Sequence, residues 1–155
     1  MLVLMEQEEQ RQSIKDEMIT VIEEARMVLP GVQALFGFQL IAVFSATFDS
    51  LSHAERRLHL LAMALVALTI VLIMAPAAFH RIAKQGWMSR WLIDTTSNFL
   101  TASMAVLMVA LSVEFGLVGG LILRDTTEAF ALGGALFLGL LVCWVILPLR
   151  FRRHR

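Results

Sequence analysis

The sequence predicts an all-α integral membrane protein: a bundle of four membrane-spanning helices preceded by an amphipathic helix. Hydrophobic residues make up 58% of the 155 residues and charged residues 17%, below the roughly 25% of soluble domains. The apolar residues gather in four runs of about twenty, and a helix of about that length, rising about 1.5 Å per residue, crosses the hydrocarbon core of a bilayer. The formal net charge of zero excludes a nucleic-acid partner, because no excess of basic residues is available to bind one.

The four spans are expected to form one domain over residues 29–149. We place them at about residues 29–48, 58–79, 96–121 and 129–149. Within 60–79, the clearest run, Thr69 is the single polar side chain. Pro30 and Gly31 predict a break or kink where the chain enters the first span, because proline removes a backbone donor. Pro76 predicts a bend near the end of the second span.

Residues 1–28 are expected to form an amphipathic helix in the cytoplasm. Seven acidic and three basic side chains occur between Glu6 and Arg26, on residues that favour helices. Apolar residues recur at spacings of three and four, as in a coiled-coil seam: Ile14, Met18, Val21, Ala25 and Val28. This stripe can pack on the protein's own bundle, on a neighbouring copy or on the membrane surface, and the pattern leaves these alternatives open.

Basic residues predict the orientation in the membrane. Ten Lys and Arg residues lie in the N-terminal segment, the connection between the second and third spans and the basic tail 150–155, against three on the other side. By the positive-inside rule both termini are cytoplasmic. The connection also carries Trp87 and Trp91, four residues apart beside Arg90, a pattern typical of a helix anchored at the lipid headgroups.

Two motifs carry a resemblance to a known family. The run EARMVLPGVQALF at residues 24–36 and the run APAAFHR at 75–81 resemble a family of small bacterial four-span membrane proteins known as a domain of unknown function. The likeness is strongest over residues 23–81 and elsewhere rests mainly on hydropathy. It implies a four-helix topology and a bacterial origin, hence a multi-pass protein of the bacterial inner membrane, and it supplies no activity.

Polar residues of these motifs are expected to meet at the inner membrane face. They lie at the start of the first span and the end of the second, which are antiparallel neighbours in the predicted topology. The expected cluster consists of Glu24, Arg26, His80 and Arg81. Its predicted role is structural, because polar groups near lipid are held by partners whatever the function.

Glu114 is the strongest functional signal, since it is the single acid inside an apolar run. A carboxylate in a span costs about 2.5 to 3.5 kcal/mol on insertion scales, so it needs a partner or a water-filled path. One interpretation is a proton or cation site, with Gln39, Gln33 and Ser45 of the first span lining the path. The other is a carboxyl group that bonds the hydroxyls of Ser45 or Thr47 and joins helices. No basic partner for Glu114 is evident from the sequence.

The sequence contains few of the side chains that a metal site, a cofactor site or an enzyme active site requires. Two carboxylate–histidine pairs have metal-ligand spacing, Asp49 with His53 and Glu55 with His59. No further ligand joins either pair, so we predict no metal site. We also predict no haem or other cofactor, because His59 lies at the edge of its span. Phosphate-loop, zinc-protease and dithiol motifs are missing, and the lone Cys143 allows no intrachain disulfide, so we predict no enzymatic activity.

Small residues line faces of the last two spans. Gly116 and Gly120 form a G-x-x-x-G motif in the third, and Ala131, Ala135 and Gly139 share a face of the fourth. Such faces let helix backbones approach closely, either within one chain or between copies. Packing within the chain is the simpler interpretation.

Two functions remain after these exclusions. The first is a homo-oligomeric channel or transporter for a small ion, because one four-helix bundle is too small to enclose a wide pore. The second is a non-transporting accessory or scaffold protein that binds a cytoplasmic partner protein through its N-terminal helix. The intramembrane acid favours the first slightly.

Overall fold

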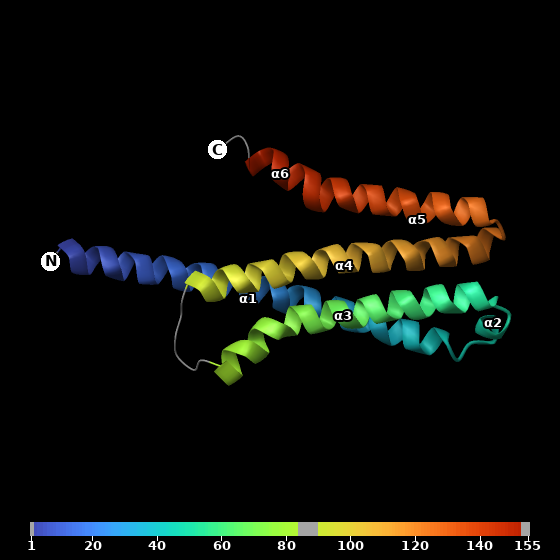
Figure 1. The fold of residues 1–155 in the computed structure, drawn as a ribbon, viewed down its shortest axis with the longest axis horizontal. Helices are drawn as coiled ribbons and strands as arrows, with labels where there is room; N and C mark the ends of the chain where they lie inside the picture. Colours follow the sequence, from blue (N-terminus) through green and yellow to red (C-terminus); the bar gives the residue numbers. More distant parts are fainter. Residues whose placement is uncertain (1, 84–89, 153–155) are drawn as a thin grey trace.

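The computed structural model describes residues 2–83 and 90–152, and the side chains of residues 2–11, 13–15, 17, 18, 80, 83, 90–92 and 152 lie outside the description. The elements are α1 (Leu2–Ala42), α2 (Ala46–Asp49), α3 (His53–Ala83), α4 (Arg90–Leu123), α5 (Thr126–Leu141), the π-helical η1 (Val142–Ile146) and α6 (Leu147–Arg152) (Figure 1). Within the described residues, four segments are long and apolar enough to cross a membrane: Ile19–Ala42, His53–Phe79, Ile93–Leu123 and Thr126–Phe151. The chain is therefore an all-α multi-pass membrane protein, as predicted.

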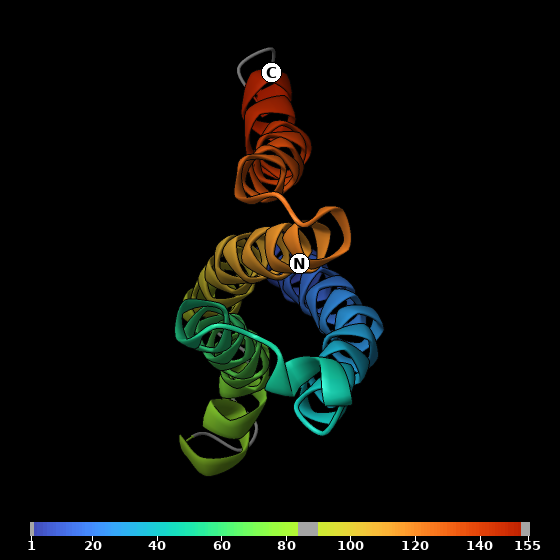
Figure 2. The same cartoon turned by 90° about the vertical axis from the view of Figure 1, so that its right-hand side faces the viewer.

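The long helices alternate in direction, and α4 lies at the centre. It packs extensively on α3 and on α5, while α1 packs on α3 and α4. Seen end-on, α1, α3 and α4 surround a common axis, and α5, η1 and α6 stand on the outer side of α4 (Figure 2). Both chain ends lie at one end of the bundle, which we call the terminal end (Figure 1). The opposite end carries the connections 43–52 and 124–125, and we call it the loop end.

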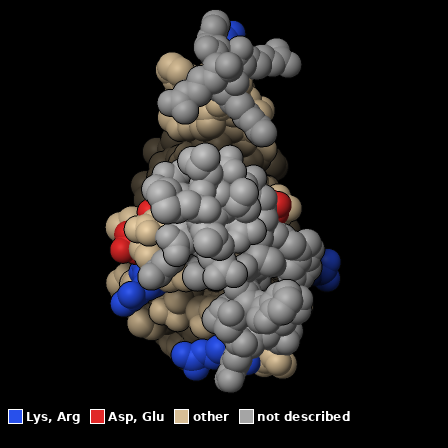
Figure 3. Space-filling view, turned by 90° about the vertical axis from the view of Figure 1, so that its left-hand side faces the viewer, with Lys and Arg blue, Asp and Glu red and all other residues tan. Residues whose placement is uncertain are grey.

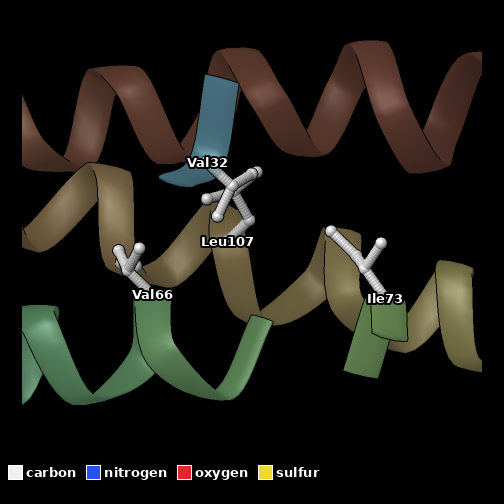
Figure 4. Close-up of a cluster of buried hydrophobic side chains, with 5 residues drawn as sticks. Val32, Val66, Ile73 and Leu107 are labelled. Carbon is white, nitrogen blue, oxygen red and sulfur yellow. The ribbon is translucent and has the colours of Figure 1, made fainter. Parts of the chain in front are cut away.

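The core between α1, α3 and α4 follows a repeat of three and four residues. The buried stripe of α3 consists of His59, Ala62, Val66, Thr69, Ile73 and Pro76. The matching buried or half-buried stripe of α4 consists of Ile93, Thr96, Leu100, Ser103, Leu107, Ala110 and Glu114. This repeat keeps side chains on one helix face, the arrangement of left-handed bundles. Val32 of α1, Val66 and Ile73 of α3 and Leu107 of α4 belong to one buried apolar cluster, in which Val32 lies next to Leu107 (Figure 4).

α1 runs unbroken from the N-terminal segment into the first span, so of the break or kink predicted at Pro30 and Gly31 the break does not occur. Proline removes one backbone hydrogen bond, but Ala25 and Leu29 before it and Val32 after it pack on the same core. This packing outweighs the lost bond and keeps the helix continuous. The helix ends at Ala42, ahead of the predicted boundary at about 48.

The described part of the predicted N-terminal stripe packs on the protein's own bundle. Ala25 contacts the core and Val21 is half-buried. Val28 is exposed, and Leu29 takes the inward position instead. The side chains of Ile14 and Met18 lie outside the described part.

α3 and α4 extend beyond the predicted spans 58–79 and 96–121. Residues 80–83 and 90–94, expected in an interfacial segment, are the last turn of α3 and the first turn of α4. Trp87 and the side chain of Trp91 lie outside the described residues, so their headgroup anchor stays a prediction. Figure 1 shows α3, which contains the buried Pro76, curving toward its C-terminal end.

The last span continues through Pro148 to α6 instead of ending near residue 149. The proline ring clashes with the carbonyl one turn earlier in a regular α-helix. That carbonyl belongs to Trp144, within the π-helical turn η1. A widened π-turn relieves such a clash, and it explains why the helix changes type here without breaking.

α4 and α5 approach closely at Gly116 and Gly133. A Cβ atom on Gly116 would lie 2.9 Å from the backbone oxygen of Ala129 and 3.3 Å from Cα of Gly133. Gly120 also faces Ala129, whose Cβ would be 2.7 Å away. The G-x-x-x-G motif therefore packs within the chain, as predicted.

The other small residues of α5 face outward. A Cβ atom on Gly134 or Gly139 would meet nothing within 4 Å. Ala131 and Ala135 are likewise exposed. One side of α5 is therefore packed on α4, and the side with the predicted small-residue face is open.

A capping box starts α3 at the loop end. The Ser52 hydroxyl accepts from the Glu55 backbone N–H at 3.3 Å, and the Glu55 carboxylate accepts from the Ser52 N–H at 2.7 Å. These bonds satisfy donors that the first helical turn leaves unpaired.

We expect Ser52→Ala to lower the free energy of unfolding by about 1 kcal/mol, because the hydroxyl cap is lost. Denaturation in mixed detergent micelles measures this change. Ser97→Ala is the matched control, since Ser97 is exposed inside α4 and its hydroxyl makes no bond there. Its effect is expected within about 0.5 kcal/mol of zero. Equal losses in the two variants would contradict the capping role.

Candidate functional site: a buried polar cluster

Three polar residues from three helices meet inside the loop end of the bundle. They are Gln39 in the last turn of α1, His59 near the start of α3 and Glu114 on α4. Nδ1 of His59 lies 3.0 Å from Oε1 of Glu114, and Nε2 lies 3.1 Å from the backbone oxygen of Gln39. We call this group the polar cluster. Through the His59 ring it joins all three core helices.

The register of each helix brings these residues together. His59 precedes Ala62 in the α3 stripe, and Glu114 follows Ala110 in the α4 stripe. Gln39 comes seven residues, one heptad, after the buried Val32 on α1. Each polar residue thus takes a core position that an apolar residue holds elsewhere along the same helix.

The cluster is shielded from its surroundings. Gln39 and His59 each expose 3% of their surface, and the Glu114 side chain exposes 18%. Three buried hydroxyls elsewhere, those of Thr69, Ser103 and Ser112, bond the backbone of their own helices. The polar cluster differs from them because its hydrogen bonds cross between helices.

The hydrogen bonds restrict where protons sit. A backbone carbonyl only accepts, so Nε2 of His59 carries a hydrogen and donates it to Gln39. Nδ1 and the Glu114 Oε1 then share one more proton. Either an imidazolium donates to a carboxylate, or a protonated carboxyl group donates to a neutral imidazole. In both states the pair has zero net charge.

Three polar atoms of the cluster have unused hydrogen-bonding capacity. Nε2 and Oε1 of the Gln39 side chain and Oε2 of Glu114 are buried and have no hydrogen-bond partner within the described chain. Leaving such a group unpaired costs about 1 to 3 kcal/mol. Together they offer one donor group and two acceptor oxygens to a water molecule or an ion.

At the loop end α2 lies beside the end of α1, and its connection runs across to the start of α3 (Figure 2). We call α2 and this connection the lid. Phe48 of α2 packs its ring against the His59 ring, with centroids 5.6 Å apart and planes at 70°. The Arg56 guanidinium lies 5.7 Å from the Phe48 centroid and donates to the backbone oxygens of Asp49 and Leu51 at 2.8 and 3.2 Å. Arg56 therefore holds the α2 connection, and Phe48 with it, over His59.

Comparison with known proteins places the chain in a family. The model of DUF6328, a family of unknown function, matches residues 6–148. The chain belongs to the DUF6328 family. Comparisons with curated proteins and with solved structures find no significant match. The DUF6328 match contains all three residues of the polar cluster, and it extends the predicted resemblance from two motifs to nearly the whole chain.

Two of the four residues predicted to line an ion path belong to the polar cluster of this DUF6328 protein. Glu114 and Gln39 are in it. Gln33, six residues before Gln39, is exposed, as expected for a different direction around the helix. Ser45 is also exposed, and its hydroxyl donates to the backbone oxygen of Ala42 at 2.8 Å. The hydroxyl groups suggested as Glu114 partners do not serve that role, because its hydrogen-bond partner is His59.

His59 is the residue of the cluster that sequence reasoning missed. We placed it at the edge of the second span, whereas it is buried in the bundle. Its spacing of three from Ala62 and seven from Val66 is the signal that could have found it. The two carboxylate–histidine pairs with metal-ligand spacing, from which we predicted no metal site, are not formed in the described chain. Glu55 binds the Ser52 backbone while His59 binds Glu114, and Asp49 and His53 belong to different helices.

The residues predicted to cluster at the inner face are not joined in the described part of this DUF6328 protein. Glu24, Arg26 and Arg81 are exposed and form no ion pair with one another. The side chain of His80 lies outside the description. Figure 3 looks onto this terminal end and shows described acidic and basic side chains at its surface.

Proposed function

We propose that this DUF6328 protein transports a small ion across a membrane and that the polar cluster is the ion's binding site. The observation that carries the proposal is the buried His59–Glu114 pair beside the unpartnered Gln39 side chain. Ionisable residues in a span are costly, and they typically line ion or proton paths. A purely structural link between helices would not require the additional unpaired atoms, since each of them costs stability.

The surroundings of the cluster favour a transporter over an open channel. Phe48 covers it toward the loop end. Toward the terminal end the axis is filled by apolar side chains, among them Val32, Val66 and Leu107 (Figure 4). The cluster is thus closed on both sides, as expected for a transporter that opens to one side at a time.

We also propose that the protein forms a homo-oligomer and that it has the orientation predicted from its basic residues. Copies would associate through the open side of α5, where Ala131, Ala135 and Gly139 permit close helix approach. Both termini would face the cytoplasm of a bacterial cell, following the distribution of basic residues. The loop end and the lid would then face outward.

One observation favours the alternative function, an accessory protein that binds a cytoplasmic partner without transport. α1 projects beyond α4 at the terminal end (Figure 1). Its first half carries the acidic residues that such a partner would contact. The experiment below separates the two functions.

The purified protein in liposomes is expected to carry an ion flux that Glu114→Gln reduces to the level of protein-free vesicles. Glutamine keeps the size and hydrogen-bonding of the side chain and removes its ionisable group. Fluorescent indicators for protons, sodium and potassium measure the flux. Glu128→Gln, at an exposed acid in the first turn of α5, is the matched control and should retain the flux.

A second pair of variants tests the unpartnered amide. Gln39→Leu should lose the flux, while Gln33→Leu on the exposed side of the same helix should retain it. Wild-type vesicles that move no ion faster than empty ones would rule out transport and leave the accessory function. A monomeric mass in mild detergent would contradict the homo-oligomer.

A further inference from the structure

We infer that the transported ion is a proton, held between Nδ1 of His59 and Oε1 of Glu114. This inference rests on the proposed transport function and names its substrate. The two atoms point at each other across 3.0 Å, while Nε2 donates to Gln39. One further proton completes this arrangement, whichever atom it is bonded to.

Metal cations fit the cluster less well. A divalent ion such as Ca²⁺ takes about six to eight oxygen ligands. The cluster has two acceptor oxygens without a partner, Oε1 of Gln39 and Oε2 of Glu114. Nδ1 of His59 and Oε1 of Glu114 could bind a metal ion only after their direct contact is broken. A proton needs neither extra ligands nor a wider site.

Proton binding changes the contact between His59 of α3 and Glu114 of α4. Without the proton, a neutral His59 with its hydrogen on Nε2 faces a Glu114 carboxylate, two lone pairs oppose each other, and the pair carries one negative charge. Uptake of a proton from water forms an O–H bond on the carboxyl group and removes that charge. Transfer to Nδ1 breaks this bond, forms an N–H bond and leaves the total charge at zero. Release to water reverses these steps.

Proton exchange has an available route at Oε2 of Glu114. This oxygen has no partner within the described chain, whereas Oε1 is engaged with His59. A water molecule between Oε2 and the free Gln39 amide would pass the proton to the carboxyl group. The Phe48 lid controls how water reaches this point from the loop end.

No other described charged group binds the pair. The charged or titratable side chains of the elements around it are exposed or bound to loop backbone: Asp49, His53, Glu55, Arg56, Arg57, Arg124, Asp125 and Glu128. α1 contributes only the neutral Gln39 to the cluster. The direct contact between His59 and Glu114 therefore depends on the proton that the pair itself holds.

Magnetic resonance tests whether the pair shares a proton. The full chain, with its histidine rings labelled with ¹⁵N, is placed in lipid vesicles and titrated with pH, and His59→Gln identifies the His59 signals. We expect the ring to carry its hydrogen on Nε2 throughout and Nδ1 to lose its shared proton as the pH rises. Where the proton is bonded to Glu114, an infrared carboxyl band should disappear in the same pH range and be missing in Glu114→Gln.

In Glu114→Gln the amide donates to a neutral Nδ1, so His59 should stop titrating while the protein stays folded. A His59 ring that titrates identically in the wild type and in Glu114→Gln would overturn the shared proton. The matched Glu128→Gln should titrate like the wild type.

Flux selectivity tests whether this proton is the transported ion. We expect a pH-sensitive dye inside the liposomes to report proton flux, lost in Glu114→Gln, without sodium or potassium flux. Movement of sodium or potassium without protons would overturn the inference and leave transport intact. If no ion moves while the resonance data show the shared proton, the transport function is overturned and the proton-binding pair remains.

Discussion

Replacing Gly133 by leucine is expected to separate α5 from α4, whereas the same change at the adjacent Gly134 leaves the fold intact. A Cβ atom at Gly133 would lie 2.8 Å from the backbone oxygen of Ser112 and 3.4 Å from Cα of Gly116. These backbone atoms cannot move aside as a flexible side chain can. We expect the free energy of unfolding to fall by about 3 kcal/mol, the upper end for overpacking.

Gly134→Leu is the matched control, because a Cβ atom there meets nothing within 4 Å. Its effect should stay within about 0.5 kcal/mol. Denaturation in mixed micelles measures both variants. Spin labels on the exposed Cys143 and on Met104→Cys report the separation of the helices, which should increase only in Gly133→Leu. Equal behaviour of the two glycine variants would contradict the α4–α5 packing.

His59→Leu is expected to destabilise the protein more than the double variant His59→Leu/Glu114→Leu. Removing one partner of a buried pair costs about 3 to 5 kcal/mol in soluble proteins, because the other charge stays buried and unpaired. Replacing both partners by apolar residues removes that penalty. The protein should therefore tolerate loss of the pair better than loss of half of it.

A double-mutant cycle with His59→Leu, Glu114→Leu and the double variant measures the coupling. Because the double variant is expected to be more stable than His59→Leu, the coupling free energy must exceed the loss in Glu114→Leu alone, so we expect a coupling of about 3 kcal/mol or more. The cycle of Glu128→Leu with His59→Leu is the control, and it should be additive. Additive losses at His59 and Glu114 would contradict the direct interaction.

The helices themselves could largely be predicted from the sequence, because each span is marked by its own composition. The exceptions lie at the prolines. Pro30 is tolerated inside α1 because residues on both sides of it share the core, and Pro148 is accommodated in a helix that widens to a π-turn. The sequence rule that proline breaks a helix considers only the proline itself. Whether the helix continues is decided by the packing of the residues around it.

The candidate site was predictable in part. Glu114 and Gln39 stand out as polar groups in apolar runs, and the cost of burying them predicts a partner. The identity of that partner depends on the register of α3 against α4. His59 lies only six residues after the start of α3, so by position alone it resembles a boundary residue. The lid adds Phe48, the last residue of the predicted first span, and Arg56, which lies in the predicted polar connection.

By itself, the sequence determined that the chain crosses a membrane four times as helices and that one acid lies where lipid or protein must surround it. Both properties follow from the free energy of transferring one segment from water into the membrane, which depends on that segment's own side chains. The tertiary structure alone decided that this acid pairs with His59 under Phe48, and that α5 packs on α4 through Gly116 and Gly133. Such contacts depend on the crossing and register of whole helices, which no single segment encodes.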